Sequence, residues 1–208
     1  MTACRLLVVR HGETVWNVEQ RIQGHQNSAL TNRGRRQAEL LAQRLASTAI
    51  SQLYSSDLER AIESLQPLSR RLGISPKLDA RLRERNLGVL EGLTAAESRQ
   101  QQPEAWQGFK SSDPDFVVPG GESPREFQAR VRAVVVEVAE HHPGQQVLLM
   151  AHGGTLNHVF RICLGLPAGS PRTFSTLNAS VNVVDYQSGV FRLETWGDVS
   201  HLSPDVSG

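Results

Sequence analysis

The sequence predicts an α/β protein in which a mostly parallel central sheet lies between two layers of helices. Short apolar runs of strand length alternate along the chain with longer segments of helical periodicity, the pattern of a parallel sheet with crossover helices. The 208 residues are 39% hydrophobic, which is enough to bury a substantial core. No repeat or linker divides the chain, so we expect a single domain over residues 1–208.

The first predicted strand and helix follow each other closely. The run CRLLVV (4–9) is apolar and of strand length. After a polar, glycine-containing loop, Thr31 can cap a helix that reaches about Ser47, because apolar residues recur there at helical spacing. The run ISQLYSS (50–56) then predicts a second strand.

Another helix is predicted directly after the second strand. Asp57 can provide its N-cap. We expect Pro67 to kink or restart this helix, because proline lacks a backbone donor. A short strand is expected near residues 77–78. The apolar stripe of the helix consists of Leu58, Ala61, Ile62 and Leu65.

Residues 84–124 separate the two halves of the chain. They are irregular apart from a Gln-rich helical stretch, and we expect them to form a small insertion over one end of the sheet. A long helix is predicted at about 123–141, followed by a strong buried strand, QQVLLMA (145–151). The next helix is expected to begin at Gly154 or Thr155.

The chain is predicted to close with a hairpin. SVNVVDY and VFRLETW, at 180–186 and 190–196, flank the turn sequence QSG. This hairpin could pair across the axis of a homodimer. The last dozen residues are expected to be poorly ordered or packed on an edge.

Charge and cysteine content exclude several functional classes. The 22 basic and 21 acidic residues leave a net charge of +1, so we expect neither nucleic acid nor a membrane surface as partner. Cys4 and Cys163 lie in apolar contexts, which favours buried thiols and a reduced, cytoplasmic setting. The chain lacks a signal-peptide pattern and any apolar run near about 18 residues.

The ends of two predicted strands carry histidine. LLVVRHG ends in Arg10 and His11, and VLLMAHGG ends in His152, each histidine being followed by glycine. In open α/β sheets, ligands bind beyond the carboxyl ends of the strands. If the two strands are parallel neighbours, the histidines meet at one edge, where glycine lets a ligand approach the backbone closely.

Further positive groups are expected at the same edge. Arg60 lies one turn into the helix after the second strand, and the helix after Gly153 would direct its N–H groups there. Arginine forks and a helix N-terminus match the oxygens of a phosphate dianion. The sequence therefore predicts a phosphate pocket in a chain that is neutral as a whole.

Five motifs make the sequence similar to a known family. VVRHGET, SSDLERA, LRERNLGVLEG, PGGES and AHGG occur in the order found in the histidine phosphatase superfamily, whose fold is phosphoglycerate mutase-like, and VSHL at 199–202 resembles the tail of its small bacterial phosphatases. The resemblance covers residues 5–165. It implies a three-layer sandwich with an insertion over the active site.

The resemblance implies a role for each matching residue. His11 is the nucleophile that becomes phosphorylated, and a neutral imidazole suits this step. Arg10, Arg60 and His152 bind the transferring phosphoryl group. Glu84 matches the general acid and base, and an approaching phosphate dianion would favour its protonation. Glu13 is a weaker candidate for the acid.

The substrate contacts extend beyond this group. Asn17 matches the side-chain amide that donates to the phosphoryl group in the family, although a turn residue is the alternative interpretation. Gln23 and Gly24 are expected at the rim, and Gly153 beside the phosphate. The route needs no metal and no cofactor, and no cluster has metal-ligand spacing. His25, His141, His142, His158 and His201 lie outside the motifs.

Three functions remain open. A histidine acid-type phosphatase, a phosphoric monoester hydrolase acting on a small phosphorylated metabolite, is favoured. A phosphoglycerate mutase-type phosphotransferase is less favoured, because only Lys110 is cationic between Gln100 and Arg125, and because the chain reads ERNLG where mutases usually have ERHYG. The third possibility is a non-catalytic phosphate-binding module on the same fold.

Overall fold

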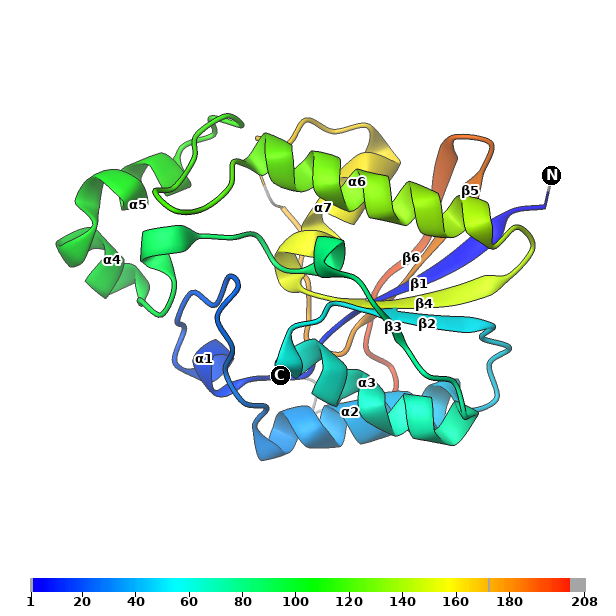
Figure 1. Ribbon diagram of the computed structural model, residues 1–208. Coiled ribbons are helices and arrows are strands. Elements are labelled where there is room, and N and C mark those ends of the chain that lie inside the picture. The colour runs from blue at the N-terminus through cyan, green and yellow to red at the C-terminus, as the bar shows by residue number, and fades with distance from the viewer. Residues whose placement is uncertain (1, 172, 203–208) are drawn as a thin grey trace.

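A six-stranded sheet in the order β3-β2-β4-β1-β5-β6 forms the centre of the protein (Figure 1). The computed structural model describes residues 2–171 and 173–202. Four strands pair in parallel, as predicted; β5 runs antiparallel to β1, and β6 runs antiparallel to β5 and therefore in the direction of the other four. The parallel strands are β1 (Cys4–Arg10), β2 (Gln52–Ser55), β3 (Lys77–Leu78) and β4 (Gln146–Ala151).

Helices cover both faces of the sheet, which confirms the three-layer architecture. In Figure 1, α6 (Pro124–His141) and α7 (Gly153–Leu164) lie above the sheet, and α2 (Asn32–Leu45) and α3 (Glu59–Leu72) lie below it. Thr31 caps α2 as predicted: its hydroxyl accepts from the Gly34 N–H at 2.9 Å. Ser123 caps α6 through a capping box with Glu126.

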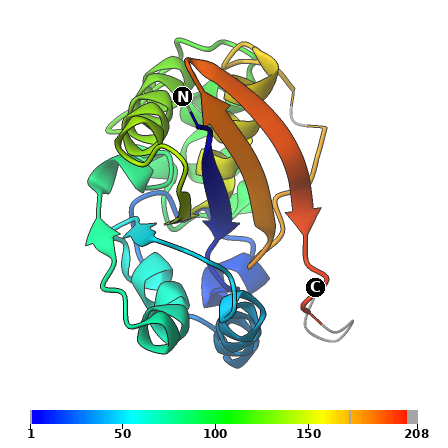
Figure 2. The ribbon, with the colours of Figure 1, turned by 90° about the vertical axis from the view of Figure 1, so that its right-hand side faces the viewer.

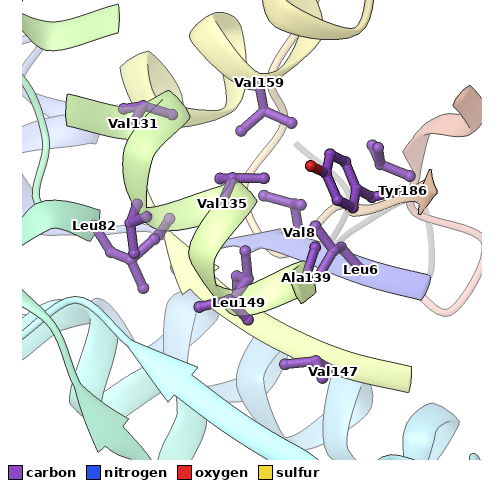
Figure 3. Close-up of a cluster of buried hydrophobic side chains, with 14 of the residues drawn as sticks. Leu6, Val8, Leu82, Val131, Val135, Ala139, Val147, Leu149, Val159 and Tyr186 are labelled. Carbon is purple, nitrogen blue, oxygen red and sulfur yellow. The ribbon is translucent and has the colours of Figure 1, made fainter. Parts of the chain in front are cut away.

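The core is divided by the sheet into two layers. Side chains alternate along β1, so that Leu6 and Val8 pack against α6 and α7, while Leu7 and Val9 pack against α2 and α3. Figure 3 shows Leu6 and Val8 beside Val135 and Val159 from the upper helices. Burial on both faces explains why the central strands are continuous apolar runs.

The closing hairpin is confirmed. β5 (Val181–Gln187) runs antiparallel to β1, and β6 (Val190–Asp198) forms the edge of the sheet (Figure 2). The turn residues Ser188 and Gly189 have φ of 50° and 86°, the left-handed conformation that two-residue hairpin turns require.

The insertion contains more regular structure than predicted. Between β3 and α6 the chain forms two single-turn 3₁₀ helices, η1 (Ala80–Leu82) and η2 (Gly88–Leu90), and two helices, α4 (Ala95–Gln101) and α5 (Pro103–Lys110). Pro103 begins α5, a position that suits proline because the first helical residue has no intrahelical hydrogen bond to lose. Figure 1 shows α4 and α5 beyond the sheet edge where β1 and β4 end.

The start of α3 differs from the prediction. Leu58 occupies its N-cap position without a side-chain cap, because Asp57 instead forms a two-fold ion pair with Arg83, at 2.5 and 2.7 Å. Pro67 does not restart the helix, which continues from Glu59 to Leu72. α7 begins at Gly153, one residue earlier than expected, with His152 as its N-cap.

Part of the C-terminal segment packs on an edge, as expected. Val199 and Leu202 contact Leu40 and Ala179, and Asp198 pairs with Arg44. The rest of the predicted segment, 203–208, lies outside the described residues. Over the described part of the chain, no helix has both the length and the apolar character needed to cross a bilayer.

Candidate active site

The two histidines meet where β1 and β4 end. These strands are parallel neighbours, and Arg10 is the register partner of Ala151, so His11 and His152 follow directly beyond the paired residues. Their ring centroids are 5.1 Å apart and the rings are tilted by 59°. The sequence prediction that the two strand ends converge is therefore correct.

His11 has a defined tautomer. Its Nδ1 lies 2.7 Å from the carbonyl oxygen of Gly12, which can only accept a hydrogen bond, so Nδ1 carries the proton and Nε2 retains its lone pair. The residue is 3% exposed. Burial lowers the pKa of His11 well below its usual value, and the guanidinium groups of Arg60 and Arg10 lower it further. The ring is therefore neutral at neutral pH.

His152 is completely buried. Neither of its ring nitrogens has a hydrogen-bond partner among the residues that the structure describes. Burial lowers its pKa well below the usual value, followed in size by the effects of Arg60, His11 and Arg10. Buried polar groups are costly without a partner, so this imidazole is suited to bind an incoming ligand.

Arg60 connects the site to the loop before α2. It is 1% exposed, and its two Nη groups donate to the carbonyl oxygens of Gly24 and Gln26 at 2.8 and 2.7 Å. Burial lowers its pKa to about 10, at which it still carries its charge at neutral pH. Within the described chain its Nε has no hydrogen-bond partner, so part of the fork is left for a ligand.

Arg10 lies against the first turn of α7. Its Nη1 donates to the carbonyl oxygen of Thr176 at 2.5 Å. A Cβ at Gly153 would lie 3.4 Å from the Arg10 Nε and 3.3 Å from the Thr176 hydroxyl, closer than side-chain carbons ordinarily pack. Glycine at 153 therefore allows the guanidinium to lie at the positive end of the helix.

Glu84 binds the same helix terminus. Its Oε2 accepts from the Gly154 N–H and its Oε1 from the Arg85 N–H, both at 2.8 Å. A Cβ at Gly154 would lie only 2.0 Å from Oε1, so a side chain at this position would force the carboxylate to move. A carboxylate at a helix N-terminus is favoured by the helix dipole.

A cavity of ≈ 400 Å³ opens in front of these groups. His11 and His152 do not belong to its lining, which agrees with their burial. The segment 174–177 was not singled out from the sequence. The lining residues are Arg10, Glu84, Gly153, Gly154, Phe174, Ser175, Thr176 and Leu177.

Asn17 is oriented by two donors. Thr14 caps the short helix α1 (Val15–Val18), and the Asn17 Oδ1 accepts from the Thr14 N–H at 3.1 Å and from the Asn178 Nδ2 at 3.2 Å. Because Oδ1 is occupied, the Nδ2 group is the part of the amide that can donate. Asn17 is therefore both a capping residue and a candidate donor, which combines the two interpretations of the sequence.

The predicted rim residues differ from each other. Gly24 contacts the site through its carbonyl, and its φ of +52° and the closeness of Glu91 require glycine. Gln23 is half-buried, and its Oε1 has no hydrogen-bond partner in the described residues. The structure therefore places the Gly24 carbonyl against Arg60. Among the described residues, the Gln23 Oε1 accepts no hydrogen bond.

Glu13 is occupied by other contacts. Its carboxylate accepts from the Thr31 hydroxyl at 2.7 Å and pairs with Arg33 at 3.0 Å. Its backbone N–H donates to Gln37. These bonds fix the loop that carries His11. Glu84 lines the cavity and Glu13 does not, which favours Glu84 as the proton donor.

Several residues that support the site were missed in the sequence. The Asn178 Nδ2 donates to the His11 carbonyl oxygen at 2.9 Å, and the Ser64 hydroxyl accepts from the Gly12 N–H at 2.9 Å. Glu91 accepts from the backbone N–H groups of His25 and Leu87. Its place within the motif LRERNLGVLEG was an available signal, whereas Asn178 is identified only by the antiparallel pairing of β5 with β1.

Comparison with known proteins identifies the family of the chain. Residues 6–199 match the family model of the histidine phosphatase superfamily (branch 1). The chain is 37% identical over 204 residues to a probable phosphoglycerate mutase GpmB of Salmonella choleraesuis, covering 95% of this chain and 94% of the relative.

Two solved structures are also similar. YhfR of Bacillus stearothermophilus is 33% identical with a TM-score of 0.87, covering 95% of this chain and 98% of that one. The mycobacterial glucosyl-3-phosphoglycerate phosphatase is 32% identical with a TM-score of 0.82, covering 94% and 99%. From the family match, the identities and the shared fold, we conclude that the chain belongs to the histidine phosphatase superfamily.

Proposed function

We propose that this protein hydrolyses small phosphate monoesters through a phosphohistidine formed on His11. The observation that carries the proposal is the state of His11: its Nδ1 proton is bound by the Gly12 carbonyl, which leaves the Nε2 lone pair for attack on phosphorus. The depressed pKa of His11 supports the same role, because only the neutral ring is a nucleophile.

In the first step, a bond forms between Nε2 of His11 and phosphorus while the ester P–O bond breaks. Glu84 gives its proton to the leaving alkoxide, so that an alcohol departs. The position of Glu84 in the cavity lining, next to Arg10 and Gly154, supports this role.

In the second step, water attacks the phosphohistidine. Glu84, now a carboxylate, takes a proton from the water, the P–N bond breaks, and inorganic phosphate is released with Nε2 restored. The same carboxylate thus acts as acid and then as base, which returns the enzyme to its starting state.

Charge on the transferring phosphoryl group needs stabilisation throughout. We assign this to Arg10, Arg60 and His152, with the Nδ2 of Asn17 as a further donor. The unpartnered ring nitrogens of His152 and the free Nε of Arg60 among the described residues support this assignment. A small phosphate ester is the partner that these groups suit, and the substrate within that class is left open.

The name of the Salmonella relative raises a mutase as the second candidate. A mutase would need cations to bind the carboxylate of a phosphoglycerate. Among the described lining residues, Arg10 is the one cation. Lys110 lies over the Trp106 ring at 5.8 Å, and Arg85 donates to the carbonyl oxygens of Glu122 and Phe116. These contacts favour hydrolysis.

Turnover of p-nitrophenyl phosphate by the purified protein, with the His11→Ala variant alongside, tests the proposal. We expect turnover that falls at least about a thousandfold in this variant, because no other group supplies the nucleophile. His141→Ala, which alters an exposed histidine bonded to the Glu137 carbonyl, is the matched control. Quenching with detergent at alkaline pH during turnover should trap a phosphoprotein that is stable in alkali and labile in acid, in the wild type but not in His11→Ala.

The alternatives give different results. Rapid exchange of 2- and 3-phosphoglycerate after priming with bisphosphoglycerate, with little release of phosphate, would establish the mutase. Absence of turnover over a broad panel of phosphate esters, with retained phosphate binding, would identify a non-catalytic module.

A further inference from the structure

One wall of the cavity has no role in the steps described above. It consists of Phe174, Ser175, Thr176 and Leu177, which precede β5. The groups assigned to the phosphate adjoin it, because Arg10 donates to the Thr176 carbonyl oxygen and a Cβ at Gly153 would lie 3.3 Å from the Thr176 hydroxyl. Glu84 and Phe174 line the same cavity, so a leaving alcohol that receives its proton from Glu84 shares this space with the Phe174 side chain.

Phe174 belongs to an aromatic cluster built from three parts of the fold. Its ring centroid is 3.9 Å from that of Phe160 on α7, with 31° between the planes, and 5.6 Å from that of Trp196 on β6. Phe160 and Trp196 also pack edge to face, at 4.8 Å. The cluster joins α7 to β6, which are adjacent in the fold, and fixes the orientation of the Phe174 ring.

Two side chains hold the backbone of this wall. The Trp196 indole N–H donates to the Ser175 carbonyl oxygen at 3.1 Å, and Arg10 donates to the next carbonyl, that of Thr176. The wall is therefore anchored to β6 on one side and to a phosphate-binding arginine on the other. Such anchoring fixes the position of the segment that carries Phe174 relative to Arg10.

We propose that Phe174 is the specificity-determining residue of this site and selects phosphate esters whose leaving alcohol carries a ring, and that Trp196 is a positioning residue acting through the Ser175 carbonyl. The proposal rests on the function proposed above. An aromatic face attracts the C–H face of a sugar or the π face of an aryl group. The ≈ 400 Å³ cavity has room for such a group, and its other walls are largely polar.

Two pairs of ligands that differ only in the ring measure this selection. Benzyl phosphate and ethyl phosphate both release primary alcohols, so their chemical steps are comparable. Benzylphosphonate and ethylphosphonate carry the same groups but cannot be hydrolysed, and their Kd values are obtained by calorimetry. In the wild type we expect the benzyl compound to be preferred in both pairs.

Phe174→Leu keeps an apolar side chain but removes the aromatic face. We expect the benzyl-to-ethyl ratio of kcat/KM and the ratio of phosphonate affinities to fall by about three- to tenfold, mainly through KM. Trp196→Phe keeps a ring but removes the indole donor, and the same ratios should fall by about fivefold or less. Trp106→Phe, in the insertion and outside the cavity lining, is the matched control.

The outcomes separate this proposal from the proposed function. Equal ratios in the wild type and Phe174→Leu overturn the specificity proposal, even where turnover depends on His11. If kcat/KM for benzyl phosphate and for ethyl phosphate falls by the same factor in Phe174→Leu, Phe174 has a structural role, and the specificity proposal is likewise overturned. If the protein has no turnover, the phosphonate ratio alone decides: a fall in Phe174→Leu supports the proposal, and an unchanged ratio refutes it.

Discussion

Glu84 accepts a hydrogen bond from the backbone of Gly154, and its carboxylate lies where a side chain at position 154 would have to be. The Gly154 N–H donates to Oε2 at 2.8 Å, while a Cβ on the same residue would reach within 2.0 Å of Oε1. The N–H of Gly154 and the absence of a side chain on this residue therefore both determine the position of the Glu84 carboxylate.

Gly154→Ala should displace Glu84 without unfolding α7, because alanine favours helix more than glycine does. We expect kcat/KM for ethyl phosphate to fall by about 100-fold or more, the usual size of general acid catalysis, and kcat/KM for p-nitrophenyl phosphate to fall less, because nitrophenolate leaves without a proton. The constant kcat/KM is used because it excludes hydrolysis of the phosphohistidine, a step that both esters share. Glu84→Gln should give the same pattern. Steady-state kinetics with both esters checks this, and equal losses for the two would contradict it.

Gly24 tests whether Glu91 stabilises the loop that precedes α2. Gly24→Ala combines positive φ with a Cβ only 2.0 Å from the Glu91 carboxylate, whereas Gly73→Ala has positive φ but open space around the new Cβ. Both should cost stability through backbone strain. Gly24→Ala should cost about 1.5–3 kcal/mol more, the value of a lost hydrogen bond to a charged group. Urea unfolding of both variants measures the difference, and equal losses would refute the role given to Glu91.

Arg60→Lys tests whether the guanidinium fork is needed rather than its charge. Lysine has one nitrogen, which cannot serve the Gly24 and Gln26 carbonyls and a phosphate together. We expect the Kd for inorganic phosphate to rise on the order of 10- to 100-fold, with a lower melting temperature. Arg71→Lys, on the exposed side of the same helix, should leave phosphate binding as in the wild type. Calorimetry that detects no weakening in Arg60→Lys would show that charge alone suffices.

Three buried histidines predict how stability depends on pH. Burial lowers the pKa of His11 and His152 well below the usual value and that of His158 to about 3. In the unfolded chain they take up protons below about pH 6.5, while the folded protein does not. The unfolded state then binds more protons, so the free energy of unfolding falls as pH decreases through this range.

Each such histidine lowers the free energy of unfolding by up to about 1.4 kcal/mol for every unit by which the pH falls. Urea unfolding between pH 7.5 and 5 should therefore show a clear decline, in a range above the titration of the carboxylates. His158→Leu should lessen the slope by about one proton. A free energy of unfolding that stays constant from pH 7 to 5 would contradict the burial of these rings.

The sequence predicted those parts of the site that depend on one strand and its end. Two apolar runs predict two strands. The first is followed by Arg10 and His11 and the second by His152, which indicates where the two strand ends meet. The prediction succeeded because strand periodicity is local and parallel strands have a common direction.

Contacts between distant segments could not be predicted in this way. Asp57 has the pattern of a helix cap, yet its partner is Arg83, brought close by the fold. Asn178 reaches the carbonyl of His11 only because β5 is antiparallel to β1. Burial, the largest cause of the depressed pKa of His11, is likewise a property of the folded protein, whereas the two arginines were visible in the sequence.

The position of β1 between β4 and β5 has a consequence for synthesis on the ribosome. β1 is synthesised first, but its neighbours β4 and β5 end at Ala151 and Gln187. The backbone groups and apolar side chains of β1 therefore have no partners until most of the chain has been translated. Strand pairings so far apart in sequence are slow to form and leave apolar surface exposed meanwhile. A nascent chain halted before residue 181 would carry both histidines yet lack the strand that completes their surroundings.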